Sequence, residues 1–378
     1  MVAPDWLDDL ETSWADLAWD ADPELRDEVN AWWAATSPRQ KVGSRHHTVP
    51  RSCLERFATK GKIMVRDRAT GQGGLRNISD LAIRDFYTFI NLDGQRDGRL
   101  EEILAVVEGG AKEVFDQILS PFHRPGPLPP NESMRLALYL AFQFLRTPKR
   151  RREIELIGDY IIRTEHQHVR GINQVRVVPE PNEHLNHMTK SVFKLSEVFF
   201  GRPTMLITID QPSFITADEP IIYVTAGDQS HVRHRPSCFK NQKRRQKESR
   251  KPSRNRRRNM DLLHVYPTRP GALQAIEVGL PLTPRSLLVL GPPGANGPAQ
   301  RTVTGTEAEA LADDVNRRLI EQAFQWVAAN PTHPTFQAMD FPVPGPLVLA
   351  CDGGSPRSRE LDQAPSPRRP VLLGRDWH

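Results

Sequence analysis

Apolar residues recur along this chain with two different periods, and each period predicts one kind of element. Spacings of three and four residues run through 99–119, 131–147 and 306–327, which predicts a helix in each stretch. The segment 131–147 is apolar on almost every side, so we expect it to be the buried central helix. From residue 204 the pattern changes to the alternation with β-branched residues that is typical of strands.

The strand-like region extends to residue 290. Strands are expected in one sheet at 205–209, 214–216 and 221–225, and further strands at 262–266, 273–278 and 286–290. This order of elements predicts an α+β fold. In it, a helical layer around helix 131–147 packs on a mainly antiparallel sheet, and helix 306–327 closes the structure.

Charge is segregated along the chain, although the net charge is only +5. Residues 1–35 contain ten acidic residues and one arginine, a balance of −9. Residues 231–258 contain thirteen lysines or arginines and one glutamate, a balance of +12. Without this basic segment the chain would carry 5 − 12 = −7, so the body of the protein is acidic.

These changes in composition predict three parts. They are an acidic, tryptophan-rich helical arm over 1–36, a single α+β core over 40–330 with a basic insertion at 230–260, and a flexible Pro/Arg-rich tail over 331–378. No apolar run approaches the ~18 residues that span a bilayer, so we expect no membrane contact. The three cysteines form no Cys-x-x-Cys pair, which is typical of a reduced, cytoplasmic protein.

The first candidate residues for chemistry lie in the stretch 45–57. Pro50 stands where a helix could begin, directly after His46, His47 and two further residues. Because a helix N-terminus offers unsatisfied N–H groups and partial positive charge, His47 and Arg51 are well placed to meet an anion. The two histidines could equally be loop residues that hydrogen-bond to their neighbours.

The same stretch resembles the opening motif of an uncharacterised bacterial family of unknown function. The family's pattern is His-x-Val-Pro-x-x-x-Leu-x-x-Phe, and it is matched by His47, Val49, Pro50, Leu54 and Phe57. Further matches follow in order within 42–328, at Asp67, Asp85-Phe86-Tyr87, Glu101, Glu108, Gln143, Arg146, 214–218, 281–284 and Asn316. The resemblance implies candidate residues, and it implies no reaction.

Glu101 and Glu108 project from the same edge of the apolar face of helix 99–119. Two aligned carboxylates on a partly buried edge can bind a divalent cation or carry out acid–base chemistry. They can equally pair with arginines, which is the commoner arrangement at the border of a core.

Gln143 and Arg146 share one face of the buried helix. A buried guanidinium is costly unless a carboxylate or a ligand anion meets it. Glu101, Glu108 or Asp218 would serve as the internal partner, and otherwise Arg146 points at the phosphate or carboxylate of a substrate.

Three further positions each have two interpretations. Asp218 lies in a turn between predicted strands. It could act as a metal ligand or general base, or it could simply stabilise the turn. Asn316 lies at the border of the apolar face of helix 306–327. It could face a ligand, or it could hydrogen-bond the helix to the sheet. His184 and His187 could share a metal ion, but no cysteine or carboxylate lies in register with them.

The basic insertion predicts salt-sensitive binding of nucleic acid without base specificity. The alternative is a solvated loop that merely tolerates arginine. The candidate phosphate contacts are Lys243, Arg244, Arg245, Arg250, Lys251, Arg256, Arg257 and Arg258.

Together these residues predict a metal-dependent phosphodiester hydrolase, nuclease-like, with defence as a biological setting. Glu101, Glu108 and Asp218 would hold Mg²⁺ or Mn²⁺. His47 would be the general base or a ligand, and Arg51 and Arg146 would clamp phosphate. The supporting or substrate-contacting residues would be His46, Gln143 and Asn316. The alternative is a non-catalytic protein that binds nucleic acid or a partner through residues 231–258.

Overall fold

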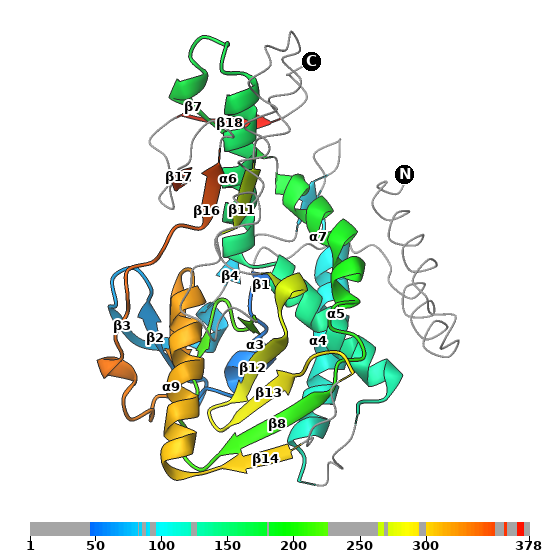
Figure 1. The fold of residues 1–378 in the computed structure, drawn as a ribbon, viewed down its shortest axis with the longest axis vertical. Coiled ribbons are helices and arrows are strands. Elements are labelled where there is room, and N and C mark those ends of the chain that lie inside the picture. Colours follow the sequence, from blue (N-terminus) through cyan, green and yellow to red (C-terminus); the bar gives the residue numbers. More distant parts are fainter. Residues whose placement is uncertain are drawn as a thin grey trace, which may run out of the picture. The chain divides into compact units, whose positions relative to one another are not determined.

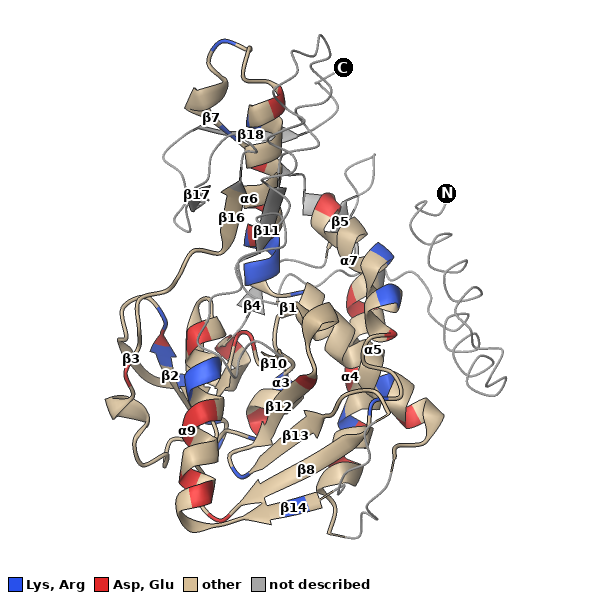
Figure 2. Ribbon diagram, viewed as in Figure 1, with Lys and Arg blue, Asp and Glu red and all other residues tan. Residues whose placement is uncertain are grey.

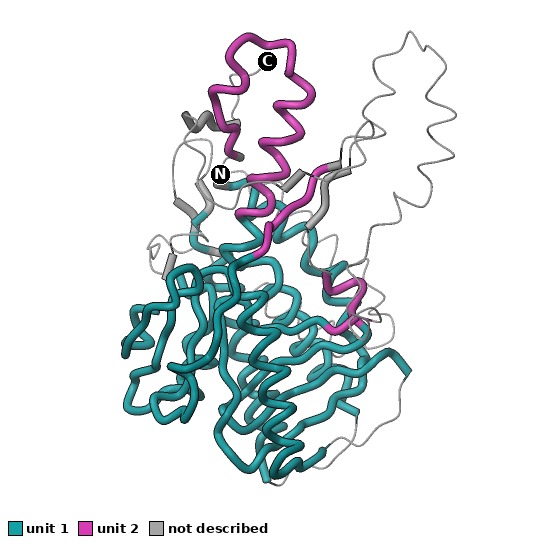
Figure 3. The backbone as a smooth tube through the Cα atoms, turned by 60° about the vertical axis from the view of Figure 1, so that its left-hand side comes forward, with its two compact units in different colours: residues 1–151, 180–223, 276–344 teal, residues 152–179, 224–275, 345–378 magenta. Residues whose placement is uncertain are grey.

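The computed structural model describes residues 46–81, 83–84, 88–90, 96–121, 127–179, 181–225, 264–267, 271–294, 300–351, 359–360 and 369–373. The predicted arm (1–36), the Asp85-Phe86-Tyr87 element and the candidate phosphate contacts of the basic insertion lie outside these residues. The chain divides into two compact units (Figure 3). Unit 1 is 1–151, 180–223 and 276–344, and unit 2 is 152–179, 224–275 and 345–378, so the predicted core 40–330 spans both.

The helices of unit 1 surround the predicted central helix. α5 (Pro130–Leu145) is buried on almost every side, and α4 (Arg99–Leu119) and α7 (Pro181–Ser196) pack along it (Figure 1). α6 (Pro148–Glu165), most of which belongs to unit 2, begins after a short break. The break arises because Pro148 lacks a backbone N–H and disfavours a helical conformation at the residue before it, Thr147. Arg146 is therefore fixed at the end of α5.

A five-stranded sheet forms the second layer of unit 1. Its order is β10 (Ile222–Val224), β12 (Glu277–Thr283), β13 (Ser286–Leu290), β8 (Thr204–Ile209) and β14 (Gln300–Val303). β12, β13 and β8 are antiparallel, whereas β14 runs parallel to β8. This combination of helices and a mainly antiparallel sheet confirms the predicted α+β fold.

A second sheet in unit 1 changes two predicted elements. Its order is β3 (Gly73–Asn77), β2 (Lys62–Asp67), β15 (Trp326–Ala329) and β9 (Thr216–Ala217). The segment 214–216 was predicted to join the sheet of 205–209, but β9 pairs with β15 instead. The last helix, α9 (Gly305–Gln322), ends before the predicted residue 327, because the backbone of the following residues bonds to Asp218.

The short elements around the motif complete unit 1. α3 (Arg51–Glu55) follows β1 (His46–His47), which pairs with β4 (Ile83–Arg84). The remaining elements are β5 (Phe89–Ile90), β6 (Arg96–Asp97), η2 (Ile78–Asp80) and η7 (Phe336–Ala338). Along α9, Figure 2 shows acidic and basic residues side by side, and these include the exposed ion pairs of Arg317 with Asp314 and Glu321.

The beginning of the predicted tail, which was expected to be flexible from residue 331, belongs to the packed part of unit 1. Phe336 is buried. The guanidinium of Arg66 donates from Nη1 to the backbone oxygens of Phe336 at 2.9 Å and Met339 at 2.8 Å. The proline-rich composition suggested a flexible tail, but Phe336 packs in the core and the backbone of Phe336 and Met339 accepts hydrogen bonds from Arg66.

Unit 2 contains small sheets. β7 (Val175–Pro179) pairs in parallel with β18 (Arg369–Leu373), and β16 (Val348–Cys351) lies between β11 (His264–Pro267) and β17 (Arg359–Glu360). Short 3₁₀ turns occur at η3 (Ile172–Gln174) and η6 (Ala272–Gln274). Within the described ranges, none of the helices combines the length and the apolar character needed to cross a membrane.

Candidate functional site

The loop between β1 and α3 carries the first candidate residues, and its apolar neighbours hold it in place. Val49, Leu54 and Phe57 are buried in one core cluster together with Trp326. Since well-packed side chains leave little freedom, this cluster fixes the direction of the preceding residues.

His46 and Glu101 form the more open part of the site. Nε2 of His46 lies 3.2 Å from Oε2 of Glu101, and the histidine side chain is fully buried while the glutamate side chain is 41 % exposed. Glu101 stands in the first turn of α4, where the helix dipole favours a negative charge. One side of this carboxylate thus lies against a buried imidazole, and part of it is open to water.

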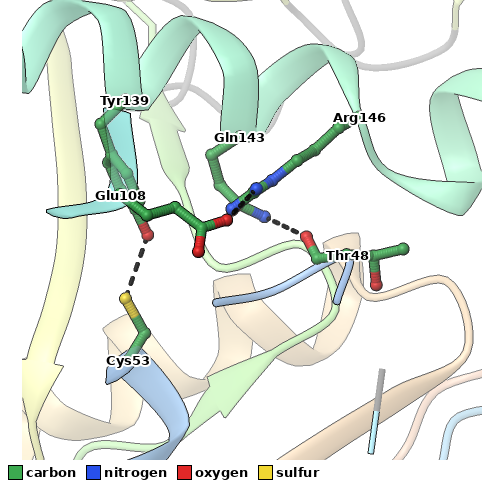
Figure 4. Close-up of polar contacts among 6 residues, drawn as sticks. All are labelled: Thr48, Cys53, Glu108, Tyr139, Gln143 and Arg146. Carbon is green, nitrogen blue, oxygen red and sulfur yellow. Dashed lines mark hydrogen bonds and ion pairs between the residues drawn. The ribbon is translucent and has the colours of Figure 1, made fainter. Parts of the chain in front are cut away.

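Arg146 is the centre of a buried network (Figure 4). It donates from Nη1 to Oε1 of Glu108 at 2.5 Å, and from Nε at 3.0 Å and Nη2 at 2.5 Å to Oε1 of Gln143. Gln143 in turn donates from Nε2 to the backbone oxygen of Thr48 at 3.0 Å. Arg146 is 1 % exposed and Glu108 26 %. The carboxylate therefore compensates a guanidinium that would be costly to bury alone.

Tyr139 lies one turn before Gln143 on α5, and its hydroxyl faces Cys53 of α3. Sγ of Cys53 lies 3.1 Å from the hydroxyl of Tyr139 (Figure 4). Burial raises the pKa of the thiol and of the phenol, so neither is an activated nucleophile. This pair is not among the residues predicted from the sequence, although Tyr139 precedes Gln143 by four residues and so shares its helix face.

Asp218 lies in a different network, between α9 and β15. Its carboxylate accepts the N–H of Phe324 at 3.0 Å and that of Gln325 at 2.5 Å. Its own N–H donates to the backbone oxygen of Trp326 at 3.2 Å. Burial raises the pKa of Asp218 to about 6, although these N–H groups act to lower it. These backbone contacts are those expected of a turn residue, the second interpretation of the sequence.

Glu219, the next residue, is a half-buried acid that is not among the residues predicted from the sequence. Burial raises its pKa to about 8, against the opposing effect of Lys149, and the charge of Asp218 raises it further. Lys149 donates from Nζ to the backbone oxygen of Gln322 at 3.1 Å. Two adjacent acids in a segment of buried strands were a usable signal, because such neighbours cannot both ionise easily.

Asn316 bonds the last helix to the chain before β9. Its Oδ1 accepts the N–H of Ile215 at 3.1 Å, and its Nδ2 donates to the backbone oxygen of Ser213 at 2.7 Å. This is the helix-to-sheet alternative of the sequence analysis. The amide is occupied by backbone groups on both sides, so it does not present itself to a ligand.

Arg51 and His47 lie on either side of the motif loop, in α3 and in β1. The Nε atom of Arg51 pairs with Glu55 at 3.0 Å, and its side chain is 60 % exposed. α3 contains only five residues, which is too short for a strong helix-terminus field. His47 stands opposite Ile83 in the β1–β4 pair. The predicted phosphate contact of Arg51 is thus on the surface, apart from the buried groups.

The structure gathers part of the predicted site and separates the rest. His46 contacts Glu101, while Gln143 and Arg146 form a network with Glu108 and with the backbone of Thr48 in the motif loop. The three predicted metal-binding carboxylates are not brought together, since each is held by a different partner. In the part of the chain that the structure describes, no three His, Cys, Asp or Glu side chains are grouped as ion ligands.

Comparison with protein families matches residues 45–333 to the family described as "Protein of unknown function (DUF4238)". This range agrees with the extent of the resemblance in the sequence, and it contains His46, Glu101, Glu108, Gln143 and Arg146. No curated protein and no solved structure matches the chain.

Proposed function

The chain belongs to the DUF4238 family of unknown function, and from this premise we propose that it cleaves phosphodiester bonds as a nuclease-like hydrolase. The contact between buried His46 and half-exposed Glu101 carries the proposal. A carboxylate that is oriented on one side and open to water on the other suits a general base.

In this proposal Glu101 is the group that meets the reactants. It removes a proton from a water molecule, whose oxygen attacks phosphorus while the bond to the leaving oxygen breaks and that oxygen takes up a proton. His46 is fully buried, so it supports Glu101 from the side of the protein without touching the substrate. General base catalysis of this kind contributes ~10²- to 10⁴-fold to a rate.

Arg146 has a supporting role here, in place of the predicted phosphate clamp. Its guanidinium is 1 % exposed and is engaged by Glu108 and Gln143. It therefore keeps the α4–α5 pair and the motif loop in register. A phosphate contact must come from elsewhere in the chain.

The proposal keeps Mg²⁺ or Mn²⁺, but without Glu108 and Asp218 as ligands. Glu101 and Glu108 are seven residues apart, so their Cα atoms are separated by about 10 Å along α4. Magnesium usually keeps several of its water ligands, so an ion held by substrate phosphate would reach Glu101 through one of these waters, and the carboxylate would stay free to act as the base. The ion would neutralise phosphate charge and acidify the attacking water.

The basic segment 231–258 supplies the affinity for nucleic acid in this proposal. Its balance of +12 can neutralise several phosphates without base readout. Binding should then weaken steeply as salt concentration rises.

The test is cleavage of labelled RNA and DNA by the full chain, with Mg²⁺, with Mn²⁺ and with a chelator. Glu101→Gln should lower the rate about 100-fold or more, in line with the loss of a general base. Glu113→Gln is the matched control, because it makes the same change on the same helix in a surface pair with Arg135. Equal rates for both variants would refute a role for Glu101.

A second candidate is a non-catalytic nucleic-acid-binding protein. It is favoured by the observation that Arg146, Asp218 and Asn316 are all bonded to protein groups. Deletion of residues 231–258 separates the two candidates. A nuclease should keep its turnover number and bind substrate more weakly, whereas a binding protein should never cleave and should lose its binding.

A further inference from the structure

Two arginines at the end of β2 share one face of the second sheet. Arg66 lies within β2, and Arg68 continues the pairing with β15, because its N–H donates to the backbone oxygen of Gln325 at 2.8 Å. Residues two apart on a strand point to the same side. The contacts agree, since the guanidinium carbons of Arg66 and Arg68 lie 4.0 Å and 5.9 Å from the centre of the Phe341 ring. Both cations therefore adjoin one ring.

Both side chains are buried without a carboxylate beside them. Arg66 is 9 % exposed and Arg68 2 %. Arg66 donates to three backbone oxygens, and Arg68 donates from Nε to that of Ile320 at 2.6 Å. Nη1 of Arg68 is buried with no hydrogen-bond partner among the described residues. Within the same residues, neither guanidinium forms an ion pair with a carboxylate.

The two acids that act electrostatically on Arg68, Asp218 and Glu321, are engaged elsewhere. The carboxylate of Asp218 accepts two backbone N–H groups, and Glu321 accepts Nη1 of Arg317 at 3.0 Å. Burial lowers the pKa of Arg66 and of Arg68, so their charged forms are disfavoured where they lie. A buried cation without a full negative charge nearby is costly, and this arrangement favours the approach of an anion.

Arg56 shows the more usual arrangement of an arginine on an aromatic ring. Its guanidinium carbon lies 5.3 Å from the centre of the Phe115 ring, and its Nη2 donates to Oδ1 of Asp116 at 2.7 Å. A carboxylate thus meets this cation beside the ring. Arg66 and Arg68 have the ring without the carboxylate, and a ring face attracts a cation more weakly than a carboxylate or phosphate does.

Phe341 belongs to a thin stretch of chain, residues 340–343, that we call the cover segment. Phe341 is half-buried, its neighbours Asp340 and Pro342 are exposed, and Val343 is 91 % exposed. The cover segment belongs to no helix or strand. Stretches with few buried contacts and no backbone ladder open at low cost. Its displacement would give a ligand access to the two guanidiniums.

We propose that Arg66 and Arg68 form a binding site for an oxyanion of the phosphate class, which reaches them when the cover segment moves aside. Arg68 binds the anion through Nη1, and Arg66 adds a second positive charge while its hydrogen bonds stay with the backbone. Guanidinium groups match phosphate oxygens in geometry, and a multiply charged phosphate balances both cations at once. The site is separate from Glu101 and does not depend on cleavage. The phosphate belongs to a small molecule or to nucleic acid.

Calorimetric titration of the full chain with pyrophosphate, at constant ionic strength, tests this site. Arg68→Met should weaken binding about tenfold or more, because hydrogen bonds between charged groups are lost. Arg56→Met is the matched control, since it removes a guanidinium from another aromatic ring and should leave the affinity unchanged. Phe341→Ala should bind pyrophosphate at least as tightly as the wild type, because the ring no longer competes for the two cations.

The melting temperature is a second readout, and it also shows that each variant is folded. Pyrophosphate should raise it in the wild type, in Arg56→Met and in Phe341→Ala by more than in Arg68→Met. The basic segment 231–258 is present in every variant, so its general affinity for anions is common to all.

Competition with a short oligonucleotide identifies the source of the phosphate. Displacement of pyrophosphate would assign the site to nucleic acid, and its retention would assign the site to a small phosphorylated molecule. The proposal is overturned if pyrophosphate binds neither the wild type nor Phe341→Ala. It is also overturned if folded Arg68→Met binds pyrophosphate as tightly as the wild type.

Discussion

The two polar networks of unit 1 use similar side chains and differ in how their acids are paired. Around Arg146, one carboxylate lies 2.5 Å from one guanidinium, so a negative charge meets a positive one. Around Asp218 and Glu219, two adjacent carboxyl groups share Lys149 and backbone donors, and their pKa values rise to about 6 and about 8. Desolvation is therefore the largest influence on the pKa values of Asp218 and Glu219.

Asp218 and Glu101 also differ in exposure and in the groups that contact their carboxylates. Asp218 is 0 % exposed and its oxygens are occupied by backbone N–H groups, so it shapes the turn between α9 and β15. Glu101, which belongs to the same helix edge as Glu108, is 41 % exposed. Among these acids, exposure together with a fixed partner distinguishes the candidate general base.

The largest effect should come from breaking the paired network. Arg146→Met should lower the free energy of unfolding by about 3 to 5 kcal/mol, because Glu108 and Gln143 lose their buried partner. Urea denaturation measures this loss. The control Arg317→Met removes exposed pairs on α9 and should change stability by less than about 1 kcal/mol. Similar losses for the two variants would show that the Arg146 network is no stronger than a surface pair.

The second network should respond to pH in the opposite sense to an ordinary salt bridge. The pKa of Glu219 is raised in the folded protein from 4.5 to about 8. The folded state therefore holds a proton that the unfolded chain releases. This contribution to stability is complete below pH 4.5 and is lost as the pH rises through about 8.

Glu219→Gln should remove that dependence, because the amide imitates the protonated carboxyl group. At pH 8 to 9 the variant should be more stable than the wild type, by on the order of 3 kcal/mol, and near pH 4.5 the two should agree. Thermal or urea unfolding across this range gives the measurement. A wild type whose stability rises over the same range, with Glu219→Gln in parallel, would contradict it.

The smallest effect should come from the contact between Cys53 and Tyr139, which lies beside the Arg146 network. Tyr139→Phe removes the hydroxyl that lies 3.1 Å from Sγ of Cys53 and should cost about 1 kcal/mol. A double-mutant cycle with Cys53→Ala isolates the pair, and its coupling energy should be about 0.5 to 1.5 kcal/mol. A coupling energy of zero would mean that the contact contributes only packing.

The fold could be predicted where local pattern and structure agree. The helix expected at 99–119 is α4, and the strand expected at 286–290 is β13, because each has a continuous pattern between clear ends. Trp326 fitted the helical stripe equally well but belongs to β15. There the backbone is turned by Asp218, a residue more than a hundred positions away, which no local period can reveal.

The same limit applies to the site. The shared face of Gln143 and Arg146 and the need of a buried guanidinium for a carboxylate could be predicted from the sequence, and Glu108 fills that role. Which of the candidate acids does so depends on how α4 packs against α5. The placement of Asp218 depends on the pairing of β9 with β15, which is again a long-range contact.

The central claim is that chemistry belongs to Glu101 and that Asp218 only shapes the chain. Cleavage of a labelled oligonucleotide by Glu101→Gln and Asp218→Asn, each assayed well below its own melting temperature, tests it most directly. We predict a fall of about 100-fold or more for Glu101→Gln and a rate close to that of the wild type for folded Asp218→Asn. Loss of cleavage in Asp218→Asn with full activity in Glu101→Gln would contradict the account.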